Sequence, residues 1–376
     1  GDDGIEVEVH IADVSHYVER NSIIDREARQ RATSVYLPGL CVPMLPERLS
    51  NDLCSLREGV DRLCFSVRFR VGPDGRVGKA EANRSVIRSR RRCTYLEVFD
   101  WLEKPRSAWP AETESCADSL ELLAEAADRL SSARRGRGSL DFDLAEPEIL
   151  LDPEGRVTAI EPSARNRAHR LIEELMVAAN TAVARIVMEA GQPCLHRVHD
   201  EPDPAKIETL GEVVKELGLK LQTSDGEASP AALQSLLEQV EGRPEEHMVA
   251  MLVLRSMARA VYTHDPRGHY ALATDAYLHF TSPIRRYPDL VTHRMLWRLI
   301  DQGRAVEGGD RDEVESRLKA LGPACSAREQ EAEKAERTAV QWKTALYLRD
   351  RVGEVFSSRI SGVVRFGFFV ELEEVF

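Results

Sequence analysis

The stretch HFTSPIRRYPDL, residues 279–290, is the segment of this chain that says most about its fold and chemistry. It sets two adjacent arginines, two hydroxyl side chains and two prolines between apolar segments. A guanidinium group matches phosphate oxygens in pairs, and prolines limit the conformations that a turn loses on ordering. The stretch therefore predicts a rigid turn that presents arginine to phosphate, with a solvated surface turn as the alternative.

Around this turn, strand patterns and helix patterns succeed one another. Residues 5–11 alternate between apolar and polar, which indicates a half-buried strand. Residues 65–71 alternate in the same way, and GPDG at 72–75 predicts a hairpin that returns from Val77. Residues 166–190 are helical and apolar on several faces, so we expect this helix to be central. Further helices are expected at 119–130, 204–217, 230–240, 245–262, 288–299 and 326–349, strand and loop at 270–280, and short strands at 352–356 and 362–370.

Length and charge set limits on the class of protein. The 376 residues suffice for one large domain or two, and 43% hydrophobic with 30% charged residues is ordinary for a globular protein. A net charge of −12 argues against wrapping nucleic acid around a basic surface, but it allows a basic channel inside an acidic shell. The cationic clusters at 88–92 and 134–137 are each interpreted as a solvated face when taken alone.

Cysteine usage and hydropathy indicate the compartment. The 7 cysteines include no CxxC pair, so we expect reduced thiols in a cytoplasmic protein, with Cys54 and Cys64 in the core. No run of eighteen apolar residues is present, so no membrane span is expected. The first residues resemble neither a signal peptide nor a transit peptide.

Three ordered blocks carry a resemblance to a known family. They are HIADVS at 10–15, the segment 33–64 with TSVYLPG, VPMLPERLSNDLCSL and DRLC, and the arginine turn. Together they resemble the catalytic domain of the ribonuclease II and ribonuclease R family, closer to ribonuclease R in Ser34-Val35 and Pro288-Asp289. The resemblance implies a mixed α/β (α+β) domain over residues 1–350, with a central curved sheet surrounded by helices. Residues 351–376 resemble the first strands of an OB-fold β-barrel of the ribosomal S-one type.

The resemblance also implies metal-dependent hydrolysis of phosphodiesters, with Mg²⁺ as the expected ion. The family's aspartate cluster is expected upstream of Gly1, just before the strand that begins this chain, so the metal ligands are not assigned. Asp2 and Asp3 are interpreted as hairpin-loop residues, or as the last two of that cluster. Asp13 and Asp52 are lesser candidates for organising the metal site.

Several aromatic and acidic residues match family positions that contact RNA. Tyr36 and Phe142 match the pair that stacks on terminal nucleotides, with ordinary core rings as the alternative. Tyr95 matches a tyrosine that helps to select ribose, together with a carboxylate from Glu173 or Glu174. Spacing does not decide between the two glutamates, and a buried ion pair to Arg170 or Arg167 is an equal alternative.

The remaining candidates lie in the turn, in the last long helix and in the tail. Arg285 matches the arginine that holds the scissile phosphate, while Arg286 is expected to contact a flanking phosphate or to pair internally. Ser282 and Thr281 can donate to phosphate or satisfy the turn. Glu336 matches a family position that lies near the RNA and weakens its binding, with a helix ion pair as the alternative. Phe366 and Phe369 resemble an aromatic RNA platform, and Phe368 is the better core candidate.

Two functions from different classes follow from these residues. The leading hypothesis is a processive 3′-to-5′ exoribonuclease that threads single-stranded RNA into a basic channel and releases 5′-mononucleotides. Its rival is a catalytically inactive relative that binds RNA or a protein partner. A hydrolase of small phosphates fits poorly, because it has no use for a stacking clamp. The leading hypothesis requires Tyr36, Phe142 and Arg285 to share a cavity.

Overall fold

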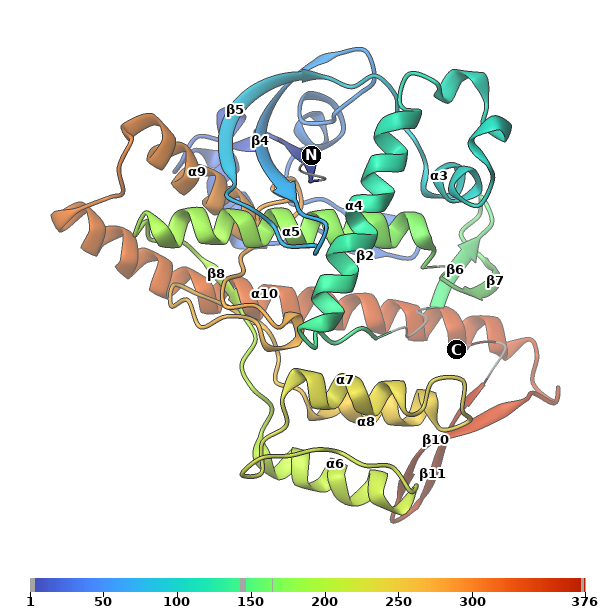
Figure 1. Ribbon diagram of the computed structural model, residues 1–376. Helices are drawn as coiled ribbons and strands as arrows, with labels where there is room; N and C mark the ends of the chain where they lie inside the picture. Colours follow the sequence, from blue (N-terminus) through green and yellow to red (C-terminus); the bar gives the residue numbers. More distant parts are fainter. Residues whose placement is uncertain (1–3, 143–146, 164, 373–374, 376) are drawn as a thin grey trace.

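The computed structural model describes residues 4–142, 147–163, 165–372 and 375 of the chain. Figure 1 shows a larger body built from sheet and helices, with a smaller helical unit beneath it. The mixed α/β architecture predicted from the sequence is confirmed. The main sheet is antiparallel with the order β1-β4-β5, from β1 (Ile5–Ala12), β4 (Asp61–Val71) and β5 (Glu81–Arg88).

The alternation of the first strand determines which face of this sheet is buried. Val7 pairs with Phe69 and Val9 with Val67, so the apolar side chains of both strands face the same core. The sheet curves over the central helix, as Figure 1 shows. Four two-stranded sheets complete the strands: β2 (Val35–Leu37) with β3 (Leu40–Val42), β6 (Pro147–Leu151) with β7 (Val157–Pro162), β8 (His196–Val198) with β9 (Val261–Thr263), and β10 (Ser358–Val364) with β11 (Gly367–Leu372).

Helices surround the sheet and connect its strands. They are α1 (Val14–Tyr17), α2 (Ile23–Arg31), α3 (Tyr95–Leu102), α4 (Ala117–Gly136), α5 (Arg167–Glu189), α6 (Pro204–Glu216), α7 (Pro230–Glu238), α8 (Glu246–Ser256), α9 (Tyr287–Gln302) and α10 (Gly308–Arg349). As predicted, α5 is central: Asn166 caps its first turn, and Leu171, Leu175 and Ala178 are buried in the main core.

The last helix, α10, is longer than the sequence indicated. It begins at Gly308 rather than near residue 326, and its 42 residues span about 63 Å. Pro323 lies inside it, which is why the sequence pattern suggested a later start. At Gly322 an added Cβ would lie 2.5 Å from the carbonyl oxygen of Tyr262. The absence of a side chain there therefore allows α10 to pack directly on β9.

A second, smaller core holds the lower unit together. Buried residues from α6, α7 and α8 form this cluster, among them Ile207, Leu233 and Val253, and Phe142 packs against it. The predicted helix at 245–262 is wrong at its end, because α8 stops at Ser256 and the chain then pairs as β9 with β8. That strand pairing depends on a partner about sixty residues away, which a local pattern does not contain.

The tail also differs from its prediction. Residues 352–356 do not form a strand, and the stretch 362–370 spans a hairpin from β10 to β11 instead of one strand. Phe368, the expected core residue, is 64% exposed, because two strands cannot enclose a core. The assignment of this tail to an OB-fold stays a prediction.

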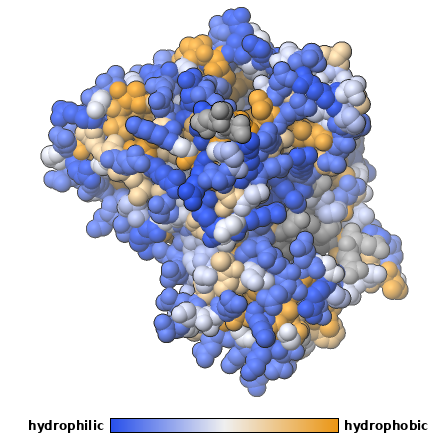
Figure 2. Space-filling view, viewed as in Figure 1, coloured by the Kyte–Doolittle hydropathy of each residue, from blue (hydrophilic) through white to orange (hydrophobic). Residues whose placement is uncertain are grey.

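The surface is mainly polar. Figure 2 shows hydrophilic side chains over most of one face, with separate apolar patches between them. Within the described part of the chain, no helix has both the length and the apolar character needed to cross a bilayer. The described cysteines are all free thiols, and Cys54 and Cys64 are buried as predicted.

Candidate functional site

The arginine turn is built around one buried carboxylate. Asp289 is fully buried and accepts hydrogen bonds from the backbone N–H of Ser282 at 2.7 Å and from Arg286 at 2.8 and 2.9 Å. Burial lowers the pKa of Arg286, but the charge and hydrogen bond of Asp289 outweigh it and hold the pKa above its ordinary value. Arg286 is therefore paired internally, as one of its two interpretations expected, and its contact with a flanking phosphate stays a prediction.

Arg285 differs from its neighbour in every one of these respects. Its side chain is exposed, and no described residue forms an ion pair or hydrogen bond with its guanidinium group. Its backbone is fixed, since its carbonyl oxygen accepts from the N–H of Ser34 at 2.9 Å and the hydroxyl of Thr33 at 3.2 Å. Among the residues that the structure describes, the fold thus presents an unpaired cation on a rigid backbone.

Below the turn, a buried polar layer holds the segment against α5. The N–H of Phe280 donates to the side chain of Asn180 at 2.9 Å, and the ring of His293 donates to the carbonyl oxygen of Phe280 at 2.8 Å. His279 shares a hydrogen bond of 2.8 Å with the phenol of Tyr262. Burial, and then the positive charges of Arg286 and Arg197, lower the pKa of His279 well below its ordinary value. This histidine is therefore neutral, which fits a structural role.

Tyr36 lies close to the same turn. It is 50% exposed in β2, two residues after the backbone contact to Arg285, and β2 runs beside α10 in Figure 1. Its backbone N–H donates to a carboxylate oxygen of Glu336 on α10 at 2.8 Å. Glu336 therefore positions the strand that carries Tyr36, and its expected effect on RNA binding stays a prediction.

One stripe of α5 connects the turn with Tyr95. The ring of Tyr95 stacks on His169, with centroids 3.9 Å apart and planes 20° apart. His169, Glu173 and Asn180 share one helical face, because the spacings of four and seven residues are close to whole turns. The stripe is about 17 Å long. Glu173 is 43% exposed and pairs with Arg165 at 2.8 Å. Of the two glutamates, Glu173 thus lies on the face toward the turn.

Glu174 points the other way, toward α4. It is buried and accepts from Arg134 at 2.8 and 3.1 Å, and Arg134 also donates to Ser139 at 2.7 Å. This ion pair is of the kind that the structural alternative expected, although the sequence proposed other partners, and the catalytic role of Glu174 stays a prediction. Arg167, one of those, pairs with Asp128 at 2.8 Å.

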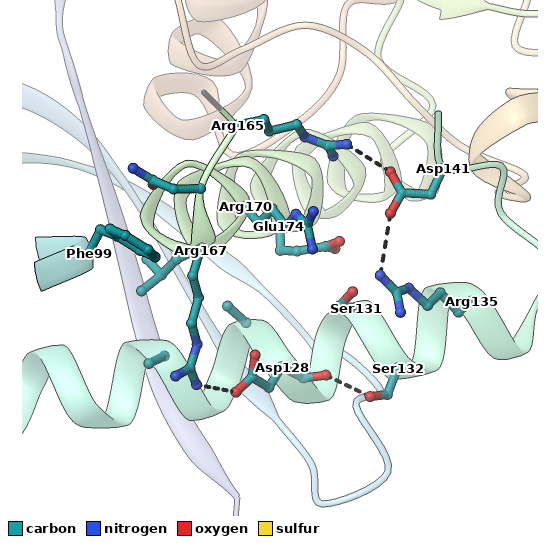
Figure 3. Close-up of a pocket in the computed structure, with 14 residues that line it drawn as sticks. Phe99, Asp128, Ser131, Ser132, Arg135, Asp141, Arg165, Arg167, Arg170 and Glu174 are labelled. Atoms are coloured by element: carbon teal, nitrogen blue, oxygen red, sulfur yellow. Dashed lines mark hydrogen bonds and ion pairs between the residues drawn. The ribbon is translucent and has the colours of Figure 1, made fainter. Parts of the chain in front are cut away.

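A cavity of about 590 Å³ lies between α4 and the first turns of α5. Figure 3 shows its lining, in which the carboxylate of Asp141 lies between Arg165 and Arg135. The distances are 3.0 and 3.4 Å. Burial raises the pKa of Asp141, but the hydrogen bond from Arg165 and the surrounding positive charge lower it overall. Four arginines and three acids line the cavity, so it suits anionic groups.

Phe142 lines an adjoining cavity of about 530 Å³ that extends to α7 and α8. The two cavities share Arg135, Asp141 and Arg170, and Arg165 donates to the carbonyl oxygen of Phe142 at 3.3 Å. Phe142 is partly buried against the smaller core. The described contacts join Tyr36 to the arginine turn but do not join Phe142 to either, so the stacking pair stays a prediction.

The two aspartates suggested for organising a metal site, Asp13 and Asp52, make their described contacts with protein groups. Asp13 caps α1, and its oxygens accept from Ser15 at 2.6 Å, the N–H of His16 at 3.1 Å and Arg84 at 2.8 Å. Asp52 pairs with Arg57 and Arg62. Across the described residues, no group of three or more potential ligands is close enough to hold an ion.

The structure does not test the aspartate cluster that the family resemblance led us to expect. Gly1, Asp2 and Asp3 lie outside the described residues, which begin at Gly4. The position of the cluster upstream of Gly1, and the two interpretations of Asp2 and Asp3, therefore stay predictions.

In the tail, Phe366 and Phe369 are 87% and 56% exposed, so both rings face solvent. Glu371 forms an ion pair of 3.0 Å with His247, which ties the hairpin to α8. The role of the two phenylalanines as an RNA platform stays a prediction.

Two further residues of the site were missed by the sequence reasoning. Asn180 interrupts an apolar helix, and that signal predicts a buried hydrogen-bond partner without naming it. The stacking of His169 on Tyr95 depends on how α3 packs on α5. Only the folded chain reveals these pairs.

Comparison with known proteins identifies the family of this chain. A family model described as the RNB domain matches residues 1–302. Ribonuclease R of Thermotoga maritima is 43% identical over 384 residues, which cover 99% of this chain and 54% of that protein.

Solved structures show the same fold. Mycoplasma genitalium RNase R in complex with ribose-methylated single-stranded RNA aligns with a TM-score of 0.92 at 33% identity, over 98% of this chain and 57% of that one. Yeast Ssd1, described as a pseudonuclease, aligns with a TM-score of 0.76 at 22% identity, which shows a shared fold alone. The chain therefore spans about half the length of the relatives it matches, 54% and 57% in these two cases.

Proposed function

The chain belongs to the RNB domain family, as its sequence motifs predicted, and from that premise we propose that it acts in a 3′-to-5′ exoribonuclease. The substrate we propose is single-stranded RNA, which is degraded processively to 5′-mononucleotides. One observation carries this proposal above the others: Arg285 is exposed and unpaired among the described residues, on a turn that Asp289 makes rigid.

The proposed role of Arg285 is to bind the scissile phosphate. A guanidinium group on a fixed backbone neutralises charge that develops on phosphate oxygens, and it does not need to reorganise during the reaction. Arg286 cannot share this role, because its fork is occupied by Asp289. Two adjacent arginines thus have different tasks, one in chemistry and one in structure.

Tyr36 supplies the proposed stacking surface next to this cation. Its half-exposed ring offers a π-face that accepts any base, so it holds RNA without selecting sequence. Ser34 and Glu336 fix the backbone of its strand on both sides. A base on Tyr36 would therefore place its phosphate within the region of Arg285.

We propose that Tyr95 and Glu173 recognise the ribose. The phenol of Tyr95 is oriented by its stack on His169, and Glu173 lies one helical turn farther along the same face. A phenol and a carboxylate together can serve a 2′-hydroxyl, which both donates and accepts. A deoxyribose would leave one of these groups without a partner.

We also propose that the reaction depends on a divalent ion, with Mg²⁺ as the expected one. No ligand is assigned to it, since the described residues contain no suitable cluster. The metal would supply charge neutralisation and an activated water. The residues of this chain would bind and orient the RNA. We propose that residues 351–376 belong to an OB-fold that also contacts it.

The test uses the full-length protein with RNA and DNA of one unstructured sequence, labelled at the 5′ end. With Mg²⁺ we expect stepwise shortening of the RNA from its 3′ end, no shortening of the DNA, and loss of activity in EDTA. Equal degradation of both would remove the ribose contact of Tyr95 and Glu173. We expect Arg285→Ala to bind RNA but to cleave it about a hundredfold more slowly, because its contact strengthens in the transition state.

A catalytically inactive RNA-binding protein is the second candidate function. The similarity to Ssd1, a pseudonuclease, favours it, because it shows that this fold occurs in such a protein. The two candidates differ in one measurement: RNA binding with no shortening in Mg²⁺ or Mn²⁺ would support the inactive binder and exclude the nuclease.

A further inference from the structure

A second arginine-rich cavity lies beyond the ion pair of Arg134 with Glu174. It has a volume of about 730 Å³ and is bounded by the turn between β4 and β5, the last turns of α4, the middle of α5 and residues 272–275. Glu174 lines both this cavity and the one in Figure 3, so the Arg134–Glu174 pair forms the wall between them. None of the residues proposed to bind RNA lines this cavity.

The charged groups of this cavity do not balance. Each of its three carboxylates has an arginine partner: Asp74 has Arg76 at 3.3 Å, Glu174 has Arg134 at 2.8 Å, and Asp275 has Arg185 at 3.3 Å.

A fourth arginine, Arg137, also lines the cavity. No carboxylate of a described residue lies within ion-pair distance of its guanidinium group. Among the described residues, the cavity therefore holds one more positive charge than negative charge.

The electrostatic field at Arg137 agrees with this count. Its pKa lies below the ordinary value, first because the protein partly desolvates the guanidinium group of this otherwise exposed side chain, and then because of the positive charges of Arg185 and Arg134. These effects outweigh the opposing charges of Glu174 and Asp275. A lowered arginine pKa means that the surroundings disfavour the cation, and an anion in the cavity would reverse this.

Arg137 has no structural task at the end of α4 that would explain its position. Its backbone N–H closes the helix onto Ala133, and Gly138 and Ser139 donate to the carbonyl oxygens of Arg135 and Arg134. The last carbonyls of the helix are thus satisfied by backbone groups. The guanidinium group is not needed as a cap.

Gly75 holds one wall of the cavity in place, and Gly138 holds the end of α4 that follows Arg137. At Gly75, in the left-handed region with φ of +70°, an added Cβ would lie 2.1 Å from the carbonyl oxygen of Arg129 on α4. At Gly138, with φ of +86°, it would lie 2.6 Å from Ala231. The hairpin turn and the end of α4 are therefore packed closely, and the cavity is formed before any ligand enters.

We propose that this cavity binds a phosphate group through Arg137, with Arg185 and Arg76 at its rim. The guanidinium fork suits phosphate oxygens, and the volume is that of a pocket for a small organic ligand. The phosphate could be the terminal group of a 5′-mononucleotide or an internal phosphate of an RNA strand. This site is separate from Arg285, so it goes beyond the proposed cleavage.

Isothermal titration of the full-length protein with inorganic phosphate, 5′-AMP, adenosine and a short RNA tests this site. We expect phosphate and 5′-AMP to bind and adenosine not to bind. Arg137→Gln should weaken the binding of 5′-AMP about tenfold, the loss of one hydrogen bond to a charged group. Arg304→Gln is the matched control, because it removes the same charge from an exposed position that pairs only with Glu307 among the described residues.

Each outcome is decisive. If Arg137→Gln weakens binding of the RNA but not of phosphate or 5′-AMP, the source of the phosphate is a strand. If it weakens binding of 5′-AMP while Arg285→Gln leaves that binding intact, the site is a separate nucleotide site. Unchanged affinity for all four probes in Arg137→Gln, or an equal loss in Arg304→Gln, would overturn the proposal.

Discussion

Replacing Asp289 with asparagine should loosen the arginine turn. The carboxylate is fully buried and accepts three hydrogen bonds, one from Ser282 and two from Arg286. Asparagine keeps an oxygen for Ser282 but leaves the buried guanidinium group without its counter-charge. Removing one partner of a buried ion pair costs about 3–5 kcal/mol of unfolding free energy. We therefore expect Asp289→Asn to be strongly destabilising at the turn.

Hydrogen exchange measures this effect where it arises. The N–H of Ser282 is protected by Asp289, so a peptide that spans residues 279–290 reports the opening of the turn. A loss of about 3–5 kcal/mol corresponds to exchange that is faster by about two to four powers of ten. Urea unfolding, followed by circular dichroism, should show a lower midpoint for the same variant.

Two further variants make the test specific. Arg286→Met combined with Asp289→Asn removes the unpaired cation and keeps an acceptor for Ser282, so it should regain most of the lost stability. Asp350→Asn breaks an exposed pair with Arg349 and should change nothing measurable. If Asp289→Asn behaved like Asp350→Asn in both assays, the buried pair would not be what holds the turn.

Three more predictions concern the glutamates, the buried histidines and the free arginine. Glu173→Gln should reduce the preference for RNA over DNA with little change in thermal stability. Glu174→Gln should lower the unfolding free energy by about 3 kcal/mol and leave that preference intact. Cleavage rates on RNA and DNA of the same sequence, together with melting curves, distinguish the two variants. Burial lowers the pKa of His196 to about 4 and of His269 to about 3, from 6.5, so both stay neutral in the fold. Stability should be complete above pH 6.5 and fall below it by about 1.4 kcal/mol per pH unit for each histidine, until the folded pKa is reached; urea midpoints between pH 7 and 4 that do not change would contradict this. Arg285→Lys should recover only part of the cleavage lost in Arg285→Ala, since an ammonium group lacks the planar fork, and full recovery would show that charge alone is required.

Local patterns predicted most elements of the fold correctly. The alternation in residues 5–11 predicted β1, the apolar stripe from residue 166 predicted α5, and the GPDG turn predicted the hairpin of β4 and β5. These signals arise because side chains on one face of a strand or helix enter the same core. The failures share a cause, since β9 and the start of α10 depend on packing against distant segments.

The candidate site shows more clearly which features local sequence predicts and which depend on distant segments. The sequence motifs identified the family and the arginine turn and assigned the scissile phosphate to Arg285, but they left open whether Arg286 pairs internally and did not distinguish Glu173 from Glu174. In each pair the two side chains are chemically identical and adjacent along the chain. The buried Asp289 forms an ion pair with Arg286, and the buried Arg134 forms one with Glu174. Arg285 and Glu173 are exposed to solvent.

The sequence by itself therefore determined the order of the elements, the family and the chemical kind of group at the site. Tertiary structure alone decided that Asp289 engages Arg286, which glutamate faces the turn, and that Arg137 keeps an unbalanced charge among the described residues. The physical reason is that the role of a charged side chain depends on its desolvation and its nearest opposite charge. Both depend on segments that the fold brings together from far apart in the chain.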